Sequence, residues 1–124
     1  MEKKVIDKVC EFKLEKNVLL SSFNHYSMIR VKQYNPNIKT GLLYDAILYN
    51  AHEYIKTVGA DALHPFYPSM MDEKIVNDIK ENGIMINAYT VNSEEHMKRL
   101  IALKIDGIIT NYPDKLNKVL QKIN

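Results

Sequence analysis

Five short apolar segments recur along this chain at a steady interval, and each is followed by a stretch with helical periodicity. The segments begin near residues 18, 39, 61, 84 and 107, so the repeat is roughly 22 residues long. Strands that alternate with helices at this spacing predict a parallel α/β fold with right-handed crossovers. The 124 residues therefore predict a single domain, residues 1–124, of five parallel strands alternating with helices.

Helix signals separate the five segments. Helices are expected over residues 2–15, 24–34, 45–58 and 72–82, after Asn92, and from Pro113 onward. Asn24, Asp45 and Asn92 are the expected N-caps, because their side chains can accept hydrogen bonds from the first free amides of a helix. Asn92 also has the spacing of a capping box with Glu95.

An open five-stranded sheet and part of a (β/α)8 barrel of the TIM type are both compatible with this repeat. Strands of an open doubly wound sheet are usually near-continuous apolar runs. Here polar side chains interrupt the strands, at Ser21, Ser22, Thr40, His64, Asn87 and Thr90. Because polar residues near strand ends suit a barrel whose mouth holds a site, the pattern favours a partial (β/α)8 barrel.

The composition excludes several classes of partner. The net charge is +2, with acidic and basic residues interspersed, which gives no basis for binding nucleic acid or an anionic membrane. No apolar run approaches the ~18 residues of a membrane-spanning helix. The N-terminus lacks a signal-peptide pattern, and the single cysteine, Cys10, suits a reducing compartment, so a cytoplasmic location is expected. Glycine-rich phosphate loops and metal-binding Cys or His patterns are absent from the sequence.

Six residues at or near strand ends form the candidate ligand-binding set: Phe23, His64, Tyr89, Asn92, Thr110 and Asn111. At the end of its strand, His64 could hydrogen-bond a phosphate or orient a ligand; the alternative is a packed histidine before a rigid loop. Phe23 and Tyr89 could form an apolar wall, or could simply pack in the barrel. The three polar residues could donate hydrogen bonds to an anionic ligand, although Asn92 is equally well explained as an N-cap.

The sequence motifs at the strand ends resemble those of the glycerophosphodiester phosphodiesterases. The resemblance rests on five motifs in the right order: Val18–Asn24, Gly41–Leu43, Ala60–Pro65, Asn87–Asn92 and Asp106–Asp114. Tyr89 stands where that family usually has tryptophan, and Asn111 where it often has aspartate. The family fold is a (β/α)8 barrel of about 250 residues, so the resemblance implies that this chain corresponds to the last five βα units, the C-terminal portion of the barrel.

The resemblance also implies an activity. The intact family hydrolyses glycerophosphodiesters to an alcohol and glycerol 3-phosphate, using two histidines in H-R-G and H-D motifs and carboxylates that hold a divalent metal, Mg²⁺ or Ca²⁺. In this sequence the histidines are followed by Tyr26, Glu53, Pro65 and Met97, so neither motif occurs. Glu11 opens a run similar to the family's E-I-K glutamate motif, but it lies in an expected helix.

We therefore expect the chain to supply walls of a substrate pocket, with no catalytic residue, no metal ligand and no cofactor of its own. The small-molecule partner would be a glycerophosphodiester if the barrel were completed. A second hypothesis is a non-catalytic binding or assembly module. Five parallel strands cut from a barrel leave two strand edges open, so a homo-oligomer or a complementing chain with the first three strands is expected to cover them.

Overall fold

The computed structural model describes residues 1–123. Within them the strands are β1 (Leu19–Ser22), β2 (Lys39–Tyr44), β3 (Ala62–Pro65), β4 (Met85–Ala88) and β5 (Gly107–Ile108). The helices are α1 (Glu2–Glu11), α2 (His25–Tyr34), α3 (Ala51–Val58), α4 (Glu73–Glu81), α5 (Glu94–Ala102) and α6 (Pro113–Ile123), and a short 3-10 helix, η1, covers Tyr67–Met70.

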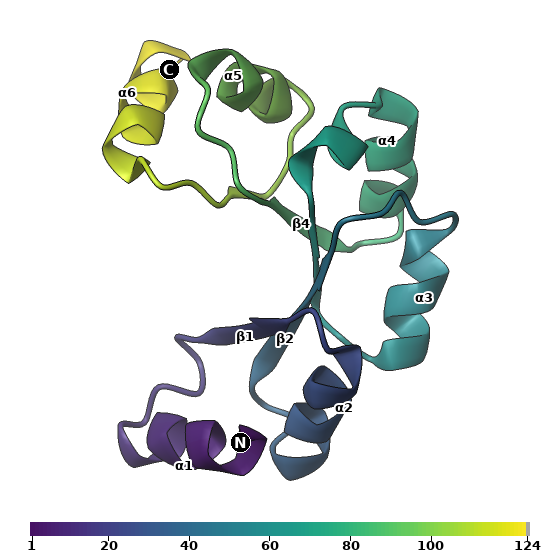
Figure 1. Ribbon diagram of the computed structural model, residues 1–124, viewed down its shortest axis with the longest axis vertical. Helices are drawn as coiled ribbons and strands as arrows, with labels where there is room; N and C mark the ends of the chain where they lie inside the picture. Colours follow the sequence, from purple (N-terminus) through teal and green to yellow (C-terminus); the bar gives the residue numbers. More distant parts are fainter. Residues whose placement is uncertain (124) are drawn as a thin grey trace.

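The strands form one sheet in the order β1-β2-β3-β4-β5, and every neighbouring pair is parallel. The order follows the sequence without the reversal that marks the switch point of an open doubly wound sheet. Figure 1 shows the strands along the inside of an open arc and the helices around its outside. Sequential parallel strands with helices on one side only are the arrangement of a (β/α)8 barrel, and the prediction of a partial barrel is confirmed.

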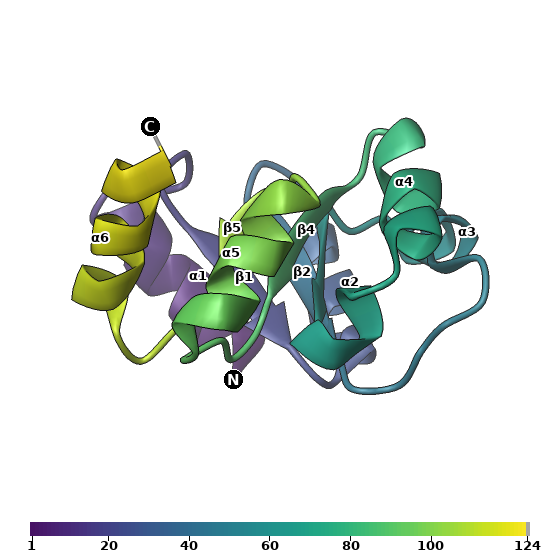
Figure 2. The same cartoon turned by 90° about the horizontal axis from the view of Figure 1, so that it is seen from above.

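The helices follow one another around the arc as their strands do. In the view from above, α5 lies between α6 and α4 (Figure 2). Asn24 caps α2 by accepting a hydrogen bond from the Ser27 amide, as the sequence predicts. Among the described residues, none of the helices combines the length and the apolar character that a membrane crossing requires.

Two of the expected helix starts are wrong. Asp45 does not cap a helix, because the chain first makes a loop over residues 45–50 and α3 begins only at Ala51. Ile47, an apolar residue within the range 45–58 that was expected to be helical, is exposed in the loop. At the start of α5 the N-cap is Ser93, whose hydroxyl accepts from the His96 amide, so the side chain of Asn92 is left for other partners.

The core lies between the sheet and the helices. Strand residues alternate in direction, so Leu42, Leu63 and Ile86, which are register neighbours on adjacent strands, face the helix layer together. All three are fully buried. Burying one such side chain contributes about 1.5–3 kcal/mol, so this side of the sheet holds the helices in place.

The residues between these positions point to the opposite side of the sheet, which we call the inner face. It comprises Gly41, Leu43, Ala62, His64, Met85, Asn87 and Gly107, as the strand register requires. No helix of the described chain covers this face (Figure 1). In a closed barrel the inner face is filled by layers of side chains from all eight strands.

Candidate functional site

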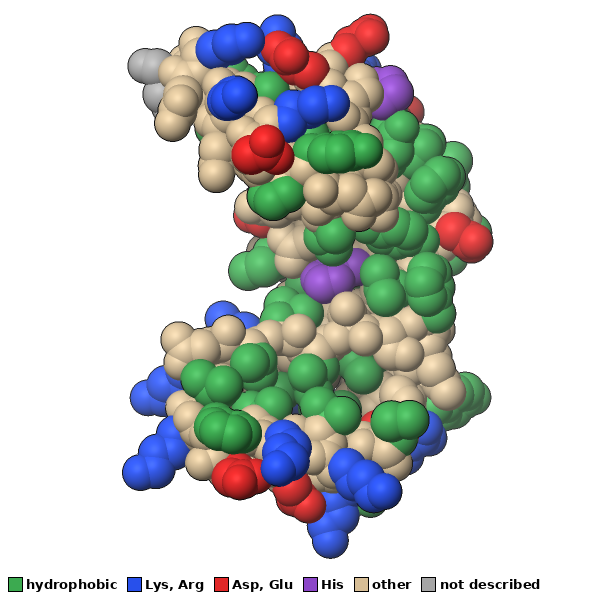
Figure 3. Space-filling view, turned by 60° about the vertical axis from the view of Figure 1, so that its left-hand side comes forward, with side chains coloured by type: hydrophobic (Ala, Val, Ile, Leu, Met, Phe, Trp, Pro, Cys, Tyr) green, Lys and Arg blue, Asp and Glu red, His purple; other side chains and the backbone are tan. Residues whose placement is uncertain are grey.

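Aromatic side chains stand on the inner-face side just beyond the carboxyl ends of the strands. The ring centroids of Phe23 and Tyr89 are 5.9 Å apart with an edge-to-face angle of 89°, and those of Phe66 and Tyr89 are also 5.9 Å apart. Phe23 remains 61% exposed and Phe66 42% exposed. Figure 3 shows hydrophobic side chains gathered on this side of the molecule, where it is hollowed. These rings form an apolar wall, as the sequence predicts for Phe23 and Tyr89.

Backbone and side-chain bonds fix the central ring of this wall. Tyr89 extends β4 by pairing with Phe66, and its amide donates to the Pro65 carbonyl at 3.0 Å. Its hydroxyl donates to the Tyr44 carbonyl at 3.1 Å. Burial, with a smaller contribution from the charge of Asp45, raises the pKa of the Tyr89 hydroxyl, so the group stays protonated and acts as a donor.

His64 lies below the aromatic wall, on the inner face, and only 5% of it is exposed. Its Nε2 is 3.1 Å from the side-chain nitrogen of Asn87 on the neighbouring strand. Its Nδ1 is buried and has no hydrogen-bond partner within residues 1–123. Burial lowers the pKa of the imidazole, because the charged form is poorly solvated there, and His64 is therefore neutral at neutral pH.

Gly41 makes room for the imidazole. A Cβ atom at this position would lie 2.6 Å from His64 Nε2 and 2.7 Å from Cε1, far inside ordinary contact distance. The ring therefore rests flat against the backbone of the neighbouring strand β2. The absence of a side chain at Gly41 is therefore what allows the imidazole to lie at this position.

The three polar residues of the candidate set form a separate group that links the ends of β4 and β5. Asn92 Oδ1 accepts from the Thr110 hydroxyl at 3.2 Å and from the Asn111 amide at 3.0 Å. The Thr110 hydroxyl oxygen accepts in turn from the Tyr112 amide. The Thr110 hydroxyl, which the sequence suggested as a donor to a ligand, already has a partner within the protein, and so does the backbone amide of Asn111. Lys115 donates to the Asn92 carbonyl at 3.0 Å and adds a positive charge here.

His25, at the start of α2, is a second histidine near the carboxyl ends of the strands, and its contacts link three elements of the fold. Its Nε2 donates to the Leu43 carbonyl at 2.8 Å, and its Nδ1 accepts from the Tyr54 hydroxyl at 2.6 Å. Both ring nitrogens are therefore occupied in joining α2 to β2 and α3.

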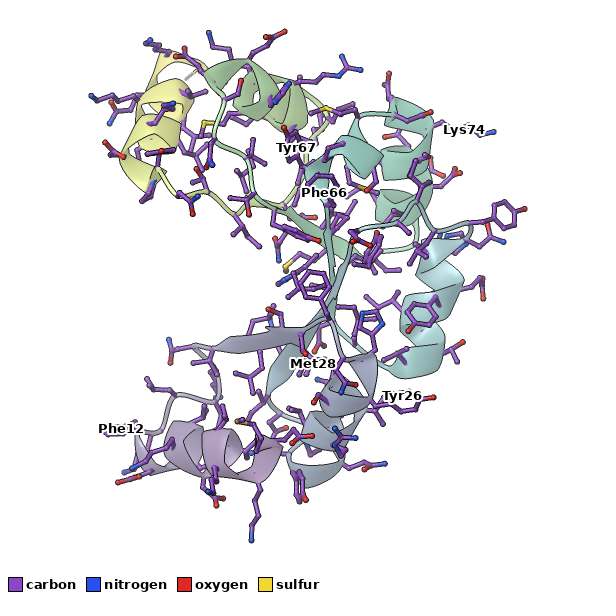
Figure 4. All side chains as sticks on the ribbon, in the orientation of Figure 1. Phe12, Tyr26, Met28, Phe66, Tyr67 and Lys74 are labelled. Atoms are coloured by element: carbon purple, nitrogen blue, oxygen red, sulfur yellow. The ribbon has the colours of Figure 1, made fainter. Side chains whose placement is uncertain are left out.

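Sequence reasoning missed Phe66 and the partnership of Asn87 with His64. An aromatic residue directly after a strand end was the available signal for Phe66, which Figure 4 shows beside Tyr67 where the chain leaves β3.

Metal ligands are not gathered on the described part of the chain: residues 1–123 contain no group of three or more His, Cys, Asp or Glu side chains that could hold an ion. The inner face offers one imidazole and one amide, His64 and Asn87. Mg²⁺ and Ca²⁺ prefer several oxygen ligands with carboxylates among them, so this donor set does not fit either ion.

The fold and the site together define a class: part of a (β/α)8 barrel with a cluster of aromatic side chains at the carboxyl ends of its strands. The sequence profile of the Glycerophosphoryl diester phosphodiesterase family matches residues 1–115. The chain belongs to this family, which confirms the resemblance of its strand-end motifs.

Individual relatives agree with this assignment. The chain is 38% identical to a glycerophosphodiester phosphodiesterase from Caldanaerobacter subterraneus subsp. tengcongensis over 122 residues, which cover 98% of this chain and 50% of the relative. A solved glycerophosphodiester phosphodiesterase from Parabacteroides distasonis superposes with a TM-score of 0.86 at 24% identity, over 98% of this chain and 50% of that structure.

A phosphodiesterase from Oleispira antarctica, solved in complex with the product sn-glycerol-3-phosphate, superposes with a TM-score of 0.82 at 25% identity, over 97% of this chain and 50% of that structure. The chain thus spans about half the length of the relatives that it matches.

Proposed function

We propose that this chain forms the substrate-binding wall of a glycerophosphodiester phosphodiesterase, with Phe23, His64 and Tyr89 lining the pocket. In this proposal residues 1–124 are the C-terminal five βα units of the barrel. The observation that carries the proposal is the inner face itself. It combines exposed aromatic rings with one buried ring nitrogen that has no hydrogen-bond partner within residues 1–123, at the strand ends, where barrel enzymes place their sites.

The chemistry of a glycerophosphodiester suits this wall. The aromatic rings can pack against the carbon chain of the glycerol, and His64 can hydrogen-bond one of the oxygens. The complex of the Oleispira antarctica relative with sn-glycerol-3-phosphate supports this choice of ligand class. Asn92, Thr110 and Asn111 would shape the rim of the pocket, and Lys115 beside them would attract the anionic ligand.

Bond cleavage is proposed to depend on the remaining part of the barrel. By family resemblance, the two acid–base histidines and the carboxylates for a divalent metal belong to the first three strands. Since the donor set of the inner face does not fit such a metal, no hydrolytic step is assigned to residues of this chain. We expect negligible turnover of glycerophosphocholine by the chain alone with Mg²⁺ or Ca²⁺. Turnover at the family's level that is lost in His64→Ala would contradict this division of labour.

Binding of sn-glycerol 3-phosphate tests the proposed wall. We expect saturable binding that weakens about tenfold in His64→Ala, because one hydrogen bond to a charged ligand is lost. Phe23→Ala should also weaken binding. The matched control is Phe12→Ala, since Phe12 is similarly exposed but lies beside α1, away from the strand ends (Figure 4). Equal weakening by all three substitutions would contradict the proposal.

A second candidate function, assembly, is favoured by the open edges of the sheet. Within residues 1–123, β1 pairs only with β2 and β5 only with β4. Met85 on the inner face and Ile109, directly after β5, are each 39% exposed, and an uncovered apolar face next to two strand edges favours association. The partner would be a second copy or a chain with the remaining βα units. Sedimentation velocity tests this: association is expected, and a strictly monomeric chain at high concentration would contradict it.

We also propose a cytoplasmic location. The support is the single cysteine, Cys10, which is typical of proteins in a reducing compartment.

A further inference from the structure

Four residues form a row across the inner face, one from each of four adjacent strands: Gly41, His64, Asn87 and Gly107. His64 and Asn87 lie one step beyond the paired Leu63 and Ile86, and Asn87 is paired directly with Gly107. The imidazole rests on Gly41, and a Cβ on Gly107 would collide with Asn87 Oδ1. Two large side chains therefore lie between two glycines, and each glycine leaves the space that its neighbour occupies.

The contact between the two large side chains determines where the proton of the imidazole lies. The side-chain nitrogen of Asn87 carries two hydrogens and can only donate, so His64 Nε2, 3.1 Å away, must accept. An accepting Nε2 carries no proton. Because the buried ring is neutral, its single proton is on Nδ1. Asn87 Oδ1 lies toward Gly107, and the nitrogen of the same amide lies toward His64.

The protonated nitrogen is also the one without a partner. Nδ1 is buried and makes no hydrogen bond to any residue that the structure describes. It is not among the three ring atoms that a Cβ on Gly41 would meet most closely, which are Nε2, Cε1 and Cδ2. Buried donors in native proteins are almost always paired, and an unpaired one indicates a missing acceptor.

We propose that Asn87 is a positioning residue that holds His64 in the Nδ1–H tautomer and so leaves one buried N–H donor for an acceptor oxygen of the bound glycerol phosphate group. The assignment of the ligand rests on the proposed function of the inner face. The tautomer does not, because it follows from the His64–Asn87 contact in the free protein. Asn87 acts through His64 and need not touch the ligand.

The tautomer can be measured in the full chain without any ligand. Long-range proton–nitrogen NMR spectra of the chain with ¹⁵N-labelled histidine distinguish a protonated Nδ1 from a protonated Nε2. For His64 we expect the proton on Nδ1. A proton on Nε2 would overturn the proposal, whatever the behaviour of any variant.

Asn87→Asp supplies the complementary test. A carboxylate can only accept, so Nε2 must become protonated, and the spectrum should change to the Nε2–H tautomer or to the doubly protonated ring. Asn37→Asp is the matched control, since Asn37 is exposed and the substitution adds the same charge away from the inner face. A His64 spectrum that is the same in Asn87→Asp as in the wild type would overturn the positioning role.

Addition of sn-glycerol 3-phosphate then tests the role of the donor. In the wild type the His64 Nδ1 signal should shift with saturation, and Asn87→Asp should weaken binding about tenfold while Asn37→Asp leaves it unchanged. A ligand that leaves Nδ1 unperturbed would overturn the assignment of the donor, and with it the proposed function of His64. The ligand-free spectra would still report on the tautomer, so the two failures are distinguishable.

Discussion

Gly41→Ala should disrupt the inner face, because the new methyl group would enter the space of the His64 ring. The alanine Cβ would lie 2.6 Å from Nε2, 2.7 Å from Cε1 and 2.9 Å from Cδ2. The nearest of these distances is roughly 0.8 Å shorter than ordinary van der Waals contact. The φ of Gly41 lies outside the left-handed range, so the backbone tolerates alanine and the cost is steric.

The expected cost of Gly41→Ala combines two effects. Overpacking of a well-filled site costs about 1–3 kcal/mol, and displacement of the ring breaks its hydrogen bond with Asn87 for about 0.5–1.5 kcal/mol more. We therefore expect the free energy of unfolding to fall by about 1.5–4.5 kcal/mol in urea denaturation. The midpoint should decrease with little change in the denaturant slope, since the surface exposed on unfolding is nearly the same.

A double-mutant cycle separates this steric explanation from a general effect of alanine in the strand. In a His64→Ala background the imidazole is absent, so the methyl group of Gly41→Ala should cost little. An equal loss of stability in the wild-type and His64→Ala backgrounds would refute the reasoning. It would mean that the ring of His64 does not occupy the space above Gly41.

Three further results are expected. Leu63→Ala should lower the free energy of unfolding by about 2–5 kcal/mol, because Leu63 is fully buried against the helices. Ile47→Ala, at an exposed loop position, should change the free energy of unfolding by less than about 0.5 kcal/mol. Equal effects of the two substitutions in urea denaturation would contradict the assigned core. Asp72→Ala should lower the free energy of unfolding by about 1 kcal/mol, since Asp72 Oδ1 accepts from the Lys74 and Ile75 amides at the start of α4. An unchanged melting temperature would contradict the assignment of Asp72 as the N-cap. Because the folded state lowers the pKa of His64, protonation of the imidazole favours the unfolded chain. The free energy of unfolding of the wild type should therefore decline relative to that of His64→Gln as the pH falls below 6.5. Parallel dependence of the two free energies on pH would contradict this.

The repeat of strands and helices is predictable from the sequence because it depends on local signals. The start of β2 and the bounds of α2 agree with expectation, since a short apolar run and a side-chain cap are both properties of short segments. Asp45 failed as a cap because a carboxylate after a strand is compatible with either a helix or a loop. The structure begins α3 six residues later, at Ala51.

The site is predictable only in part. Strand-end position predicted that Phe23 and Tyr89 lie close together, because parallel strands bring their carboxyl ends to one edge, and their rings are in contact. The contact of His64 with Asn87 joins residues 23 positions apart and depends on the register of two strands, which local patterns do not specify. Leu120 shows another limit: although it is apolar and lies on a helix, it is 37% exposed, because within residues 1–123 α6 follows the edge strand β5 and has a neighbouring helix on one side only.

The central claim is that the inner face binds the glycerol phosphate group, and backbone amide shifts test it most directly. sn-Glycerol 3-phosphate is titrated into the ¹⁵N-labelled chain while the amide signals are recorded. The account predicts saturating shifts that gather at Phe23, His64 and Tyr89 and leave Asn37, at the opposite ends of the strands, unchanged. Shifts confined to the helix-covered side, or the absence of any saturating shift, would contradict it.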